Sequence, residues 1–414
     1  MRAAWLSPLL LVPLLACRAH TTSPATLSPS ASPTAASTPS ATSERTPSST
    51  LSPAASPTPR SVRACQLPSS AHLGLGWPRS PERLPSLGTV RAVVLFADFE
   101  DAPASRSPQA VLALLSPQAE DFLAAQSYGR FALQLEPHYT WLRLSQPAAH
   151  YGASLTAYAP HLAFLQEAVD LADAQVDFSG ADLVIVLSNP DAEAIAYGPT
   201  YTGFRSSGLQ ADGVIIANGM TSGRDLLYWG WMWLPHELGH SLGLPDLYAY
   251  DAPVDQFPYS GGYSLMGNIF GFAPELSALE RWLLGWLADE QVYCLPVGEA
   301  LTVELTPIER QGGMKAVLLP LGAGRLLVVE SRRAEGYDHL LPEPGALVYV
   351  VDANLASGYG PLVVWPPAQE DAGLAHATLQ RGEALNVAGY TIEVLASTAG
   401  YDRVRLAPAT PGAP

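Results

Sequence analysis

The chain has 414 residues, which is enough for two or three domains that each bury a core and which excludes a small disulfide-stapled protein. Acidic residues outnumber basic ones by 38 to 22, and the formal net charge is −16. A surface this acidic repels phosphate backbones and anionic lipid headgroups. We therefore expect no nucleic-acid partner and no contact with a membrane beyond an N-terminal anchor.

Residues 1–17 are typical of a signal peptide with a lipobox. A basic start precedes an apolar run from Trp5 to Ala16, which is too short to cross a bilayer. The run ends in LLAC, which resembles the bacterial lipobox whose cysteine is lipidated, so we expect a lipid on Cys17. Plain secretion and an uncleaved segment are the alternatives. Lipidation or secretion would place the mature protein on the extracytoplasmic face of a bacterial membrane or outside the cell.

Residues 18–62 follow, and Ser, Thr, Pro and Ala make up 35 of the 40 residues from 21 to 60. This composition cannot bury enough apolar area to offset the entropy lost on ordering, so we predict a disordered linker. The pattern that follows is globular. We divide it into a first domain over 63–290 and a β-rich domain over 291–414, because alternating strand and helix patterns give way to short β-rich runs near residue 291.

The first domain alternates strands and helices, which predicts an α/β lobe. Continuous apolar runs and period-two alternation indicate its strands, and apolar residues at helical spacing indicate its helices. The predicted strands cover 90–96, 131–135, 139–144, 181–187 and 213–217, and the predicted helices cover 108–125 and about 155–172.

The β-rich domain contains seven short apolar runs that are separated by Gly, Pro, Asn and Asp. This pattern predicts an all-β module, most simply a sandwich. The runs cover 301–305, 315–319, 325–330, 346–351, 362–365, 391–395 and 403–406.

Two cysteines, Cys65 and Cys294, remain if Cys17 is lipidated. In an oxidising compartment they would pair as a disulfide. The alternative is two separate free cysteines, because a sequence does not place their Cα atoms.

The segment HELGH, from His236 to His240, carries the chemistry. On a helix the two histidines are i and i+4, so both imidazoles leave one face at a separation that a tetrahedral metal ion can bridge. Glu237 is placed to reach a metal-bound water as a general base instead of a ligand. The alternative is an exposed helical face. Pro235 is unusual here and predicts either a helix that begins near 231–234 or a kink.

Asp246 is the candidate third ligand. Gly243 and Pro245 end the helix, and Asp246 then occupies the place of the third histidine in the long motif HExxHxxGxxH. A carboxylate there gives zinc two nitrogens, one oxygen and an open position. Alternatively, Asp246 is a turn residue or orients another ligand, and Glu275 or Glu280 is the third ligand, as in a thermolysin-like site with a helix over 274–287.

These segments resemble the immune inhibitor A-type family of secreted bacterial zinc metallopeptidases. The resemblance is carried by HELGHSLGLPDLY (236–248), YSLMG (263–267) and PELSALERWLLGWL (274–287), with weaker similarity over about 90–400. It implies an α/β (α+β) metzincin-like catalytic domain before the sandwich-like domain. It also implies an extracytoplasmic zinc endopeptidase that acts on proteins or peptides. The implied site residues are the zinc ligands His236, His240 and Asp246, the base Glu237, and Met266 as the Met-turn beneath the metal.

Two tyrosines, an aromatic segment and a group of carboxylates each allow a structural and a functional interpretation. Tyr248 and Tyr263 are expected to pack, with oxyanion binding as the alternative. The aromatic segment 228–233 is expected in the core or a pocket wall instead of a membrane. Carboxylates follow a predicted strand at Asp98, Glu100 and Asp101, so this loop either binds calcium or is merely polar.

Two other functions remain open from the sequence. One is a surface-anchored binding protein with a non-catalytic metal site. The other is a zinc peptidase of thermolysin-like arrangement, acting as an exopeptidase.

Overall fold

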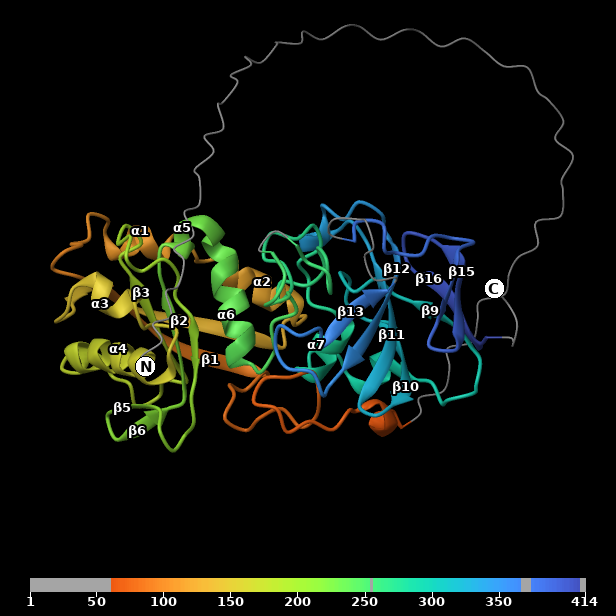
Figure 1. Ribbon diagram of the computed structural model, residues 1–414, viewed down its shortest axis with the longest axis horizontal. Coiled ribbons are helices and arrows are strands. Elements are labelled where there is room, and N and C mark those ends of the chain that lie inside the picture. The colour runs from red at the N-terminus through yellow and green to blue at the C-terminus, as the bar shows by residue number, and fades with distance from the viewer. Residues whose placement is uncertain (1–60, 254–255, 366–373, 410–414) are drawn as a thin grey trace, which may run out of the picture. The chain divides into compact units, whose positions relative to one another are not determined.

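The computed structural model describes residues 61–253, 256–365 and 374–409 (Figure 1). The predicted signal peptide, Cys17 and nearly all of the predicted linker lie outside these residues. No helix in the described ranges combines the length and the apolar character that a bilayer span requires. The described chain is mixed α/β, with several sheets and few helices, as expected from the sequence.

A five-stranded sheet of order β2-β1-β3-β7-β4 forms the centre of the N-terminal half. Its first four strands are parallel, and the edge strand β4 runs antiparallel to β7. The central strands β1 and β3 are buried on both faces, which explains their continuous apolar runs. The strands are β1 (Gly88–Asp98), β2 (Phe131–Arg143), β3 (Leu183–Ser188), β4 (Thr200–Thr202) and β7 (Asn218–Ser222), and a small hairpin adds β5 (Leu209–Ala211) and β6 (Val214–Ile216).

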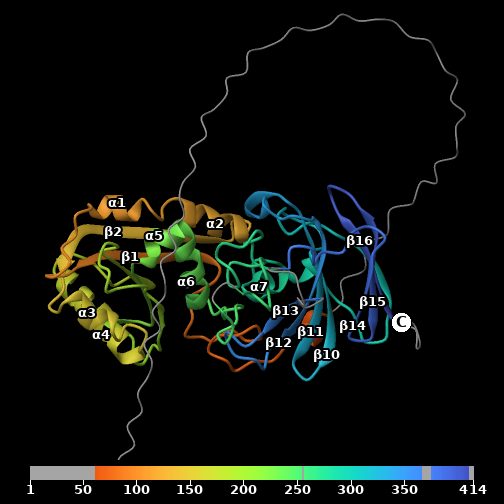
Figure 2. The ribbon, with the colours of Figure 1, turned by 45° about the horizontal axis from the view of Figure 1, so that its top comes forward.

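Helices cover both faces of this sheet (Figure 2). Alternate residues of β1 point to opposite faces, so Val94 packs with the core under α1, α2 and α6, while Leu95 packs with the core under α3 and α4. The helices are α1 (Pro108–Leu112), α2 (Gln118–Gln126), α3 (Ala148–Gly152), α4 (Tyr158–Ala172), α5 (Asp225–Trp229) and α6 (Trp233–Ser241), with a 3-10 turn at Gly230–Met232.

Two predicted boundaries in this half are wrong. The helix predicted over 108–125 is two helices, because Pro117 cannot donate a hydrogen bond within a continuous helix and instead caps α2. The strands predicted over 131–135 and 139–144 are the single strand β2, which follows β1 past a register irregularity between Val94 and Phe96.

The C-terminal half holds two further sheets, of order β13-β12-β11-β10-β8 and β14-β15-β16-β9. Apolar side chains from both, including Val329 and Ile392, share one core. The strands are β8 (Val292–Cys294), β9 (Leu301–Leu305), β10 (Ala316–Gly322), β11 (Arg325–Arg332), β12 (Gly345–Asp352), β13 (Leu362–Trp365), β14 (Ala384–Val387), β15 (Tyr390–Ser397) and β16 (Asp402–Pro408). Sequence patterns missed β8 and β14, which are only three and four residues long.

The five-stranded C-terminal sheet is buried on its other face as well. Leu318, Val328 and Tyr349 from this sheet belong to the same core cluster as Leu238 of α6 and Trp286. The core is therefore continuous across residue 290. Helix α7 (Ala278–Leu283) lies at this junction and is shorter than the helix expected over 274–287.

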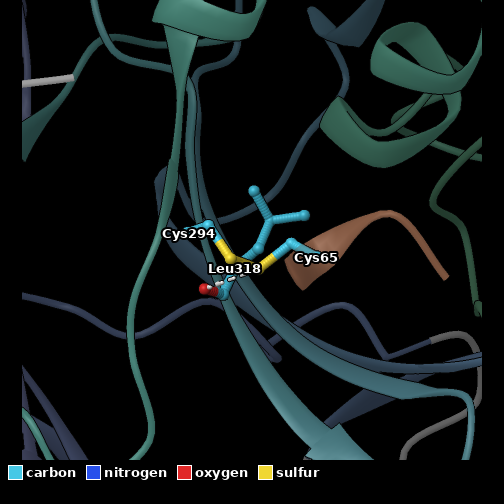
Figure 3. The surroundings of a disulfide bond; sticks show 3 residues. All are labelled: Cys65, Cys294 and Leu318. Atoms are coloured by element: carbon cyan, nitrogen blue, oxygen red, sulfur yellow. Dashed lines mark hydrogen bonds between the residues drawn. A yellow bond between two sulfur atoms is a disulfide. The ribbon is translucent and has the colours of Figure 1, made fainter. Parts of the chain in front are cut away.

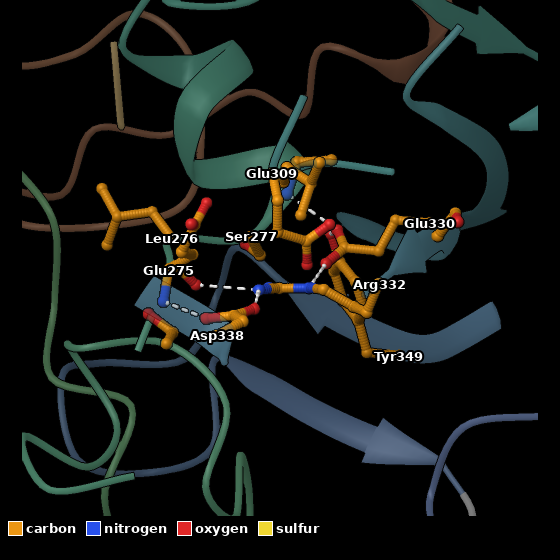
Figure 4. Close-up of polar contacts among 12 residues, drawn as sticks. Glu275, Leu276, Ser277, Glu309, Glu330, Arg332, Asp338 and Tyr349 are labelled. Carbon is orange, nitrogen blue, oxygen red and sulfur yellow. Dashed lines mark hydrogen bonds and ion pairs between the residues drawn. The ribbon is translucent and has the colours of Figure 1, made fainter. Parts of the chain in front are cut away.

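Buried ion pairs join α7 to the same sheet (Figure 4). Arg332 lies 2.6 Å from both Glu330 and Asp338, and its guanidinium also donates to the carbonyl of Glu275. Glu330 in turn accepts hydrogen bonds from Tyr349 and from the first backbone N–H of α7. Because these charges are buried and paired, removing one partner would leave an uncompensated charge in the core.

The segment 66–87 runs along the N-terminal half towards α6. Leu67, Leu75 and Leu84 are buried in the large core cluster. The amide of Leu84 donates to the carbonyl of Ser241 at 2.9 Å, and the amide of Gly74 donates to that of Gly243 at 3.1 Å. This segment is an integral part of the fold at the end of α6.

A disulfide joins Cys65 to Cys294, whose Cα atoms lie 5.8 Å apart (Figure 3). Cys65 ends the 3-10 turn Val62–Cys65, and Cys294 ends β8. The two residues are 229 positions apart in the sequence. The bond therefore ties the first described turn to the C-terminal sheet.

Loss of this disulfide should destabilise the protein. We expect Cys294→Ser to lower the free energy of unfolding by about 2–5 kcal/mol, because the unfolded chain regains the freedom that a long covalent loop removes. Urea unfolding measures the effect. The double variant Cys65→Ser with Cys294→Ser is the control and should match the single variant, whereas a wild-type midpoint for Cys294→Ser would contradict the prediction.

Candidate metal centre

Helix α6 presents the HELGH segment. It begins at Trp233, so Pro235 lies in its first turn, where a missing N–H costs no helical hydrogen bond. It ends at Ser241, and Gly243 follows with a φ of 103°, a left-handed conformation that favours glycine. Of the two explanations for Pro235, the early helix start is therefore correct.

The two histidines are oriented by backbone carbonyls. Nδ1 of His236 lies 3.0 Å from the carbonyl oxygen of Leu265, and Nδ1 of His240 lies 2.9 Å from that of Leu244. A carbonyl only accepts, so each Nδ1 carries a hydrogen and each Nε2 is the nitrogen that is left to face Asp246. Both Nε2 atoms lie beside the carboxylate of Asp246.

Asp246 completes the group with one of its oxygens. Its Oδ1 lies 3.5 Å from Nε2 of His236 and 3.3 Å from Nε2 of His240, and it is buried without a hydrogen-bond donor. The three ligand atoms lie within 4.8 Å of one another. Two imidazole nitrogens and one carboxylate oxygen thus face one point in a buried site.

The charges at this point favour a bound cation, either a proton or a metal ion that replaces it. Burial favours neutral His240, yet the carboxylate of Asp246 outweighs it and raises the pKa of His240 to about 9. Burial also opposes the charge on Asp246, but the histidines hold its pKa well below the usual range. Two imidazole nitrogens and one carboxylate oxygen are a donor set that zinc accepts, with one position left open. The residues therefore fit a metal ion, and within the described ranges no other such group occurs.

Glu237 stands apart from the ligands. One of its carboxylate oxygens accepts a hydrogen bond of 2.5 Å from the hydroxyl of Thr200 on the edge strand β4. Glu237 lines the cavity above the histidines and does not join the ligand group. Its second oxygen is left for proton transfer.

Met266 lies beneath α6. A Cβ atom at Gly239 would come within 2.5 Å of the Met266 sulfur, so the sulfur fills the space under the helix between the two histidines. The carbonyl of Met266 accepts from the amide of Leu247 at 2.9 Å, next to Asp246. The segment 264–267 thus supports both the helix and the third ligand.

The site opens into a cavity of about 700 Å³. Apolar and aromatic side chains that line it include Trp229, Trp233, Tyr248, Phe257 and Ile269. The aromatic segment 228–233 therefore contributes to a pocket wall, as expected. The charged side chains that line the cavity, among the residues described, are the acids Asp225, Glu237 and Asp246.

The rival third ligands lie elsewhere. Glu275 pairs with Arg281 at 2.5 Å, and Glu280 forms a capping box with Ser277 at the start of α7. Ser264 also donates to Glu280. Neither carboxylate joins the ligand group.

The two candidate oxyanion donors differ in position. Tyr248 lines the cavity, and burial together with Asp246 raises the pKa of its hydroxyl, which keeps the hydrogen available for donation. Tyr263 is buried away from the cavity against Phe272. Packing accounts for Tyr263, and only Tyr248 faces the site.

The carboxylates after β1 are engaged by protein groups. Asp98 forms a two-pronged pair with Arg143 at 2.6 and 2.8 Å, and Asp101 accepts from the amide of Ala148. With Glu100 they form no metal-binding group in the part of the chain that the structure describes. This geometry favours the polar-loop interpretation.

Three further residues of the site could not be predicted from the sequence. Thr200 belongs to a strand of three residues that no pattern indicates. Tyr250 lies four positions after Asp246 but carries no motif. Ser357 contacts Asp246 from 111 positions away, which only the fold brings about.

No protein-family model matches this sequence, and no curated protein is significantly similar to it. The resemblance to immune inhibitor A-type peptidases therefore stays a prediction from the motifs over 236–248, 263–267 and 274–287.

Removal of the third ligand should weaken metal binding. We expect Asp246→Ala to lower zinc affinity by about 100-fold or more, since loss of even an outer-shell partner costs 10- to 100-fold. Competition with a fluorescent chelator measures this affinity. Glu280→Gln, which is isosteric, should bind zinc as the wild type does. If Glu280→Gln lost zinc while Asp246→Ala kept it, the ligand assignment would be wrong.

Proposed function

We propose that this chain is an extracytoplasmic zinc endopeptidase. The observation that carries the proposal is the buried oxygen of Asp246 that faces both His236 and His240, with Glu237 outside this ligand group in the same cavity. The extracytoplasmic location depends on the sequence of residues 1–17 alone.

A metzincin-like catalytic domain is part of the proposal. The antiparallel edge strand β4 lies next to α6, where Thr200 contacts Glu237. Met266 packs under the helix that carries the histidines. The sandwich-like pair of C-terminal sheets follows it in the chain. Together with the motif resemblance, these features support the finer assignment.

A zinc ion held by His236, His240 and Asp246 would supply a Lewis acid that polarises the scissile carbonyl and acidifies a water molecule. Glu237 accepts the proton of the attacking water. Thr200 occupies one oxygen of this carboxylate, so the proton goes to the other. Glu237 then delivers it to the leaving amine as the peptide bond breaks.

The cavity favours cleavage within a chain over removal of terminal residues. Apart from the two histidines of the ligand group, no basic side chain that could bind a substrate's C-terminal carboxylate lines the cavity among the described residues. Asp225, a possible partner for an N-terminal amine, already accepts three backbone hydrogen bonds, from Gly198, Gly223 and Leu226. The site thus lacks a free group for recognising either chain end.

A structural role for the metal is less well supported. Structural zinc sites usually close all four positions with protein ligands. Here the ligand group has three members in the described chain, and a glutamate stands beside the open position. No observation specifically favours a binding protein.

Replacement of the base should abolish turnover and spare metal binding. We expect Glu237→Gln to lower casein cleavage by about 10²- to 10⁴-fold, the usual contribution of a general base. Its zinc affinity should stay near that of the wild type. The assay compares residues 61–414 with this variant and with a chelated sample. A folded, zinc-loaded wild type that cuts nothing would overturn the proposal.

The acidic lining should set a preference among substrates. Three carboxylates outweigh the two positive charges of a zinc ion, so acidic residues next to the scissile bond should lower kcat/KM by about tenfold, or about 1.4 kcal/mol of repulsion. Mass spectrometry of cleaved peptide libraries measures this preference. Enrichment of Asp or Glu beside the cut would contradict it.

A further inference from the structure

We infer that the loop between β12 and β13 positions the third metal ligand. Ser357 from this loop and Tyr250, which follows Asp246 in the chain, hold the carboxylate of Asp246 in place. This inference rests on the metal site of the proposed function. It assigns a role to the C-terminal sheet, which the motifs around α6 leave without one.

Ser357 contacts Asp246 twice. Its Oγ accepts the backbone N–H of Asp246 at 2.8 Å and donates to Oδ2 of the same residue at 3.1 Å. The hydroxyl of Tyr250 donates to Oδ2 at 2.5 Å. Oδ2 therefore has two donors, and the carboxylate is held with Oδ1 directed at the histidines.

The backbone of the loop reinforces this arrangement. The amide of Gly358 donates to the carbonyl of Asp246 at 3.1 Å, and the amide of Tyr250 donates to the carbonyl of Gly358 at 3.1 Å. Gly358 has a φ of 77°, and a Cβ there would lie 2.3 Å from the Tyr250 ring. The loop thus approaches the segment 246–250 too closely for any other residue at this position.

This support matters because Asp246 lies beyond the end of α6. The two histidines are fixed by a helix, whereas the third ligand lies in a stretch without regular structure. Without Ser357, the carboxylate could rotate and Oδ2 would lose a donor. Hydrogen bonds to a ligand commonly contribute 10- to 100-fold to metal affinity.

The test measures zinc affinity of the full chain by competition with a fluorescent chelator. We expect Ser357→Ala and Tyr250→Phe each to bind zinc about 10- to 100-fold more weakly. Ser357→Thr, which keeps the hydroxyl, should restore most of the affinity. Leu355→Ala, an exposed change in the same loop, should leave the affinity unchanged.

The outcomes separate this inference from the proposed function. A wild type that binds no zinc would refute the metal site itself. A wild type that binds zinc tightly, with Ser357→Ala and Tyr250→Phe binding equally well, would refute only the positioning role. A loss in Ser357→Ala that Ser357→Thr does not restore would also refute it, because the effect would then not come from the hydroxyl. Circular dichroism of the metal-free variants checks that each is folded.

Discussion

The structure around α6 depends on one electrostatic constraint, the convergence of two imidazole nitrogens and one carboxylate oxygen on a single buried point. The Nδ1–H groups of His236 and His240 donate to the carbonyls of Leu265 and Leu244. Oδ2 of Asp246 accepts hydrogen bonds from two hydroxyl groups. The two Nε2 atoms and Oδ1 of Asp246 face one another in the buried site. Buried polar atoms need partners, and a cation at this point would serve as a partner for all three.

The ligands are held together by parts of the chain that lie far apart in sequence. The turn at 264–267 supports α6 from below, and the loop around Ser357 holds Asp246 from the C-terminal sheet. A continuous core and the buried pairs of Arg332 keep that sheet fixed against α7. The two halves therefore form one frame around the candidate metal centre.

Local features of this molecule could be predicted from sequence, and non-local ones could not. The spacing of His236, Glu237 and His240 is a property of a single helix, and the buried strands β1 and β3 follow from short apolar runs. By contrast, Ser357 reaches Asp246 only through strand order, and Thr200 reaches Glu237 only because β4 pairs with β7. Patterns of apolarity also cannot show that β2 is one strand, since that depends on pairing with β1.

The disulfide has a mechanical consequence. Segment 66–87 contributes Leu73 to the cavity and is joined to the end of α6 by backbone hydrogen bonds. If the chain were pulled at residue 61, as an anchored protein would be in flowing medium, the load would pass through Cys65 into β8 by a covalent bond. The disulfide would thus share this load with segment 66–87, whose hydrogen bonds hold the cavity wall at the end of α6.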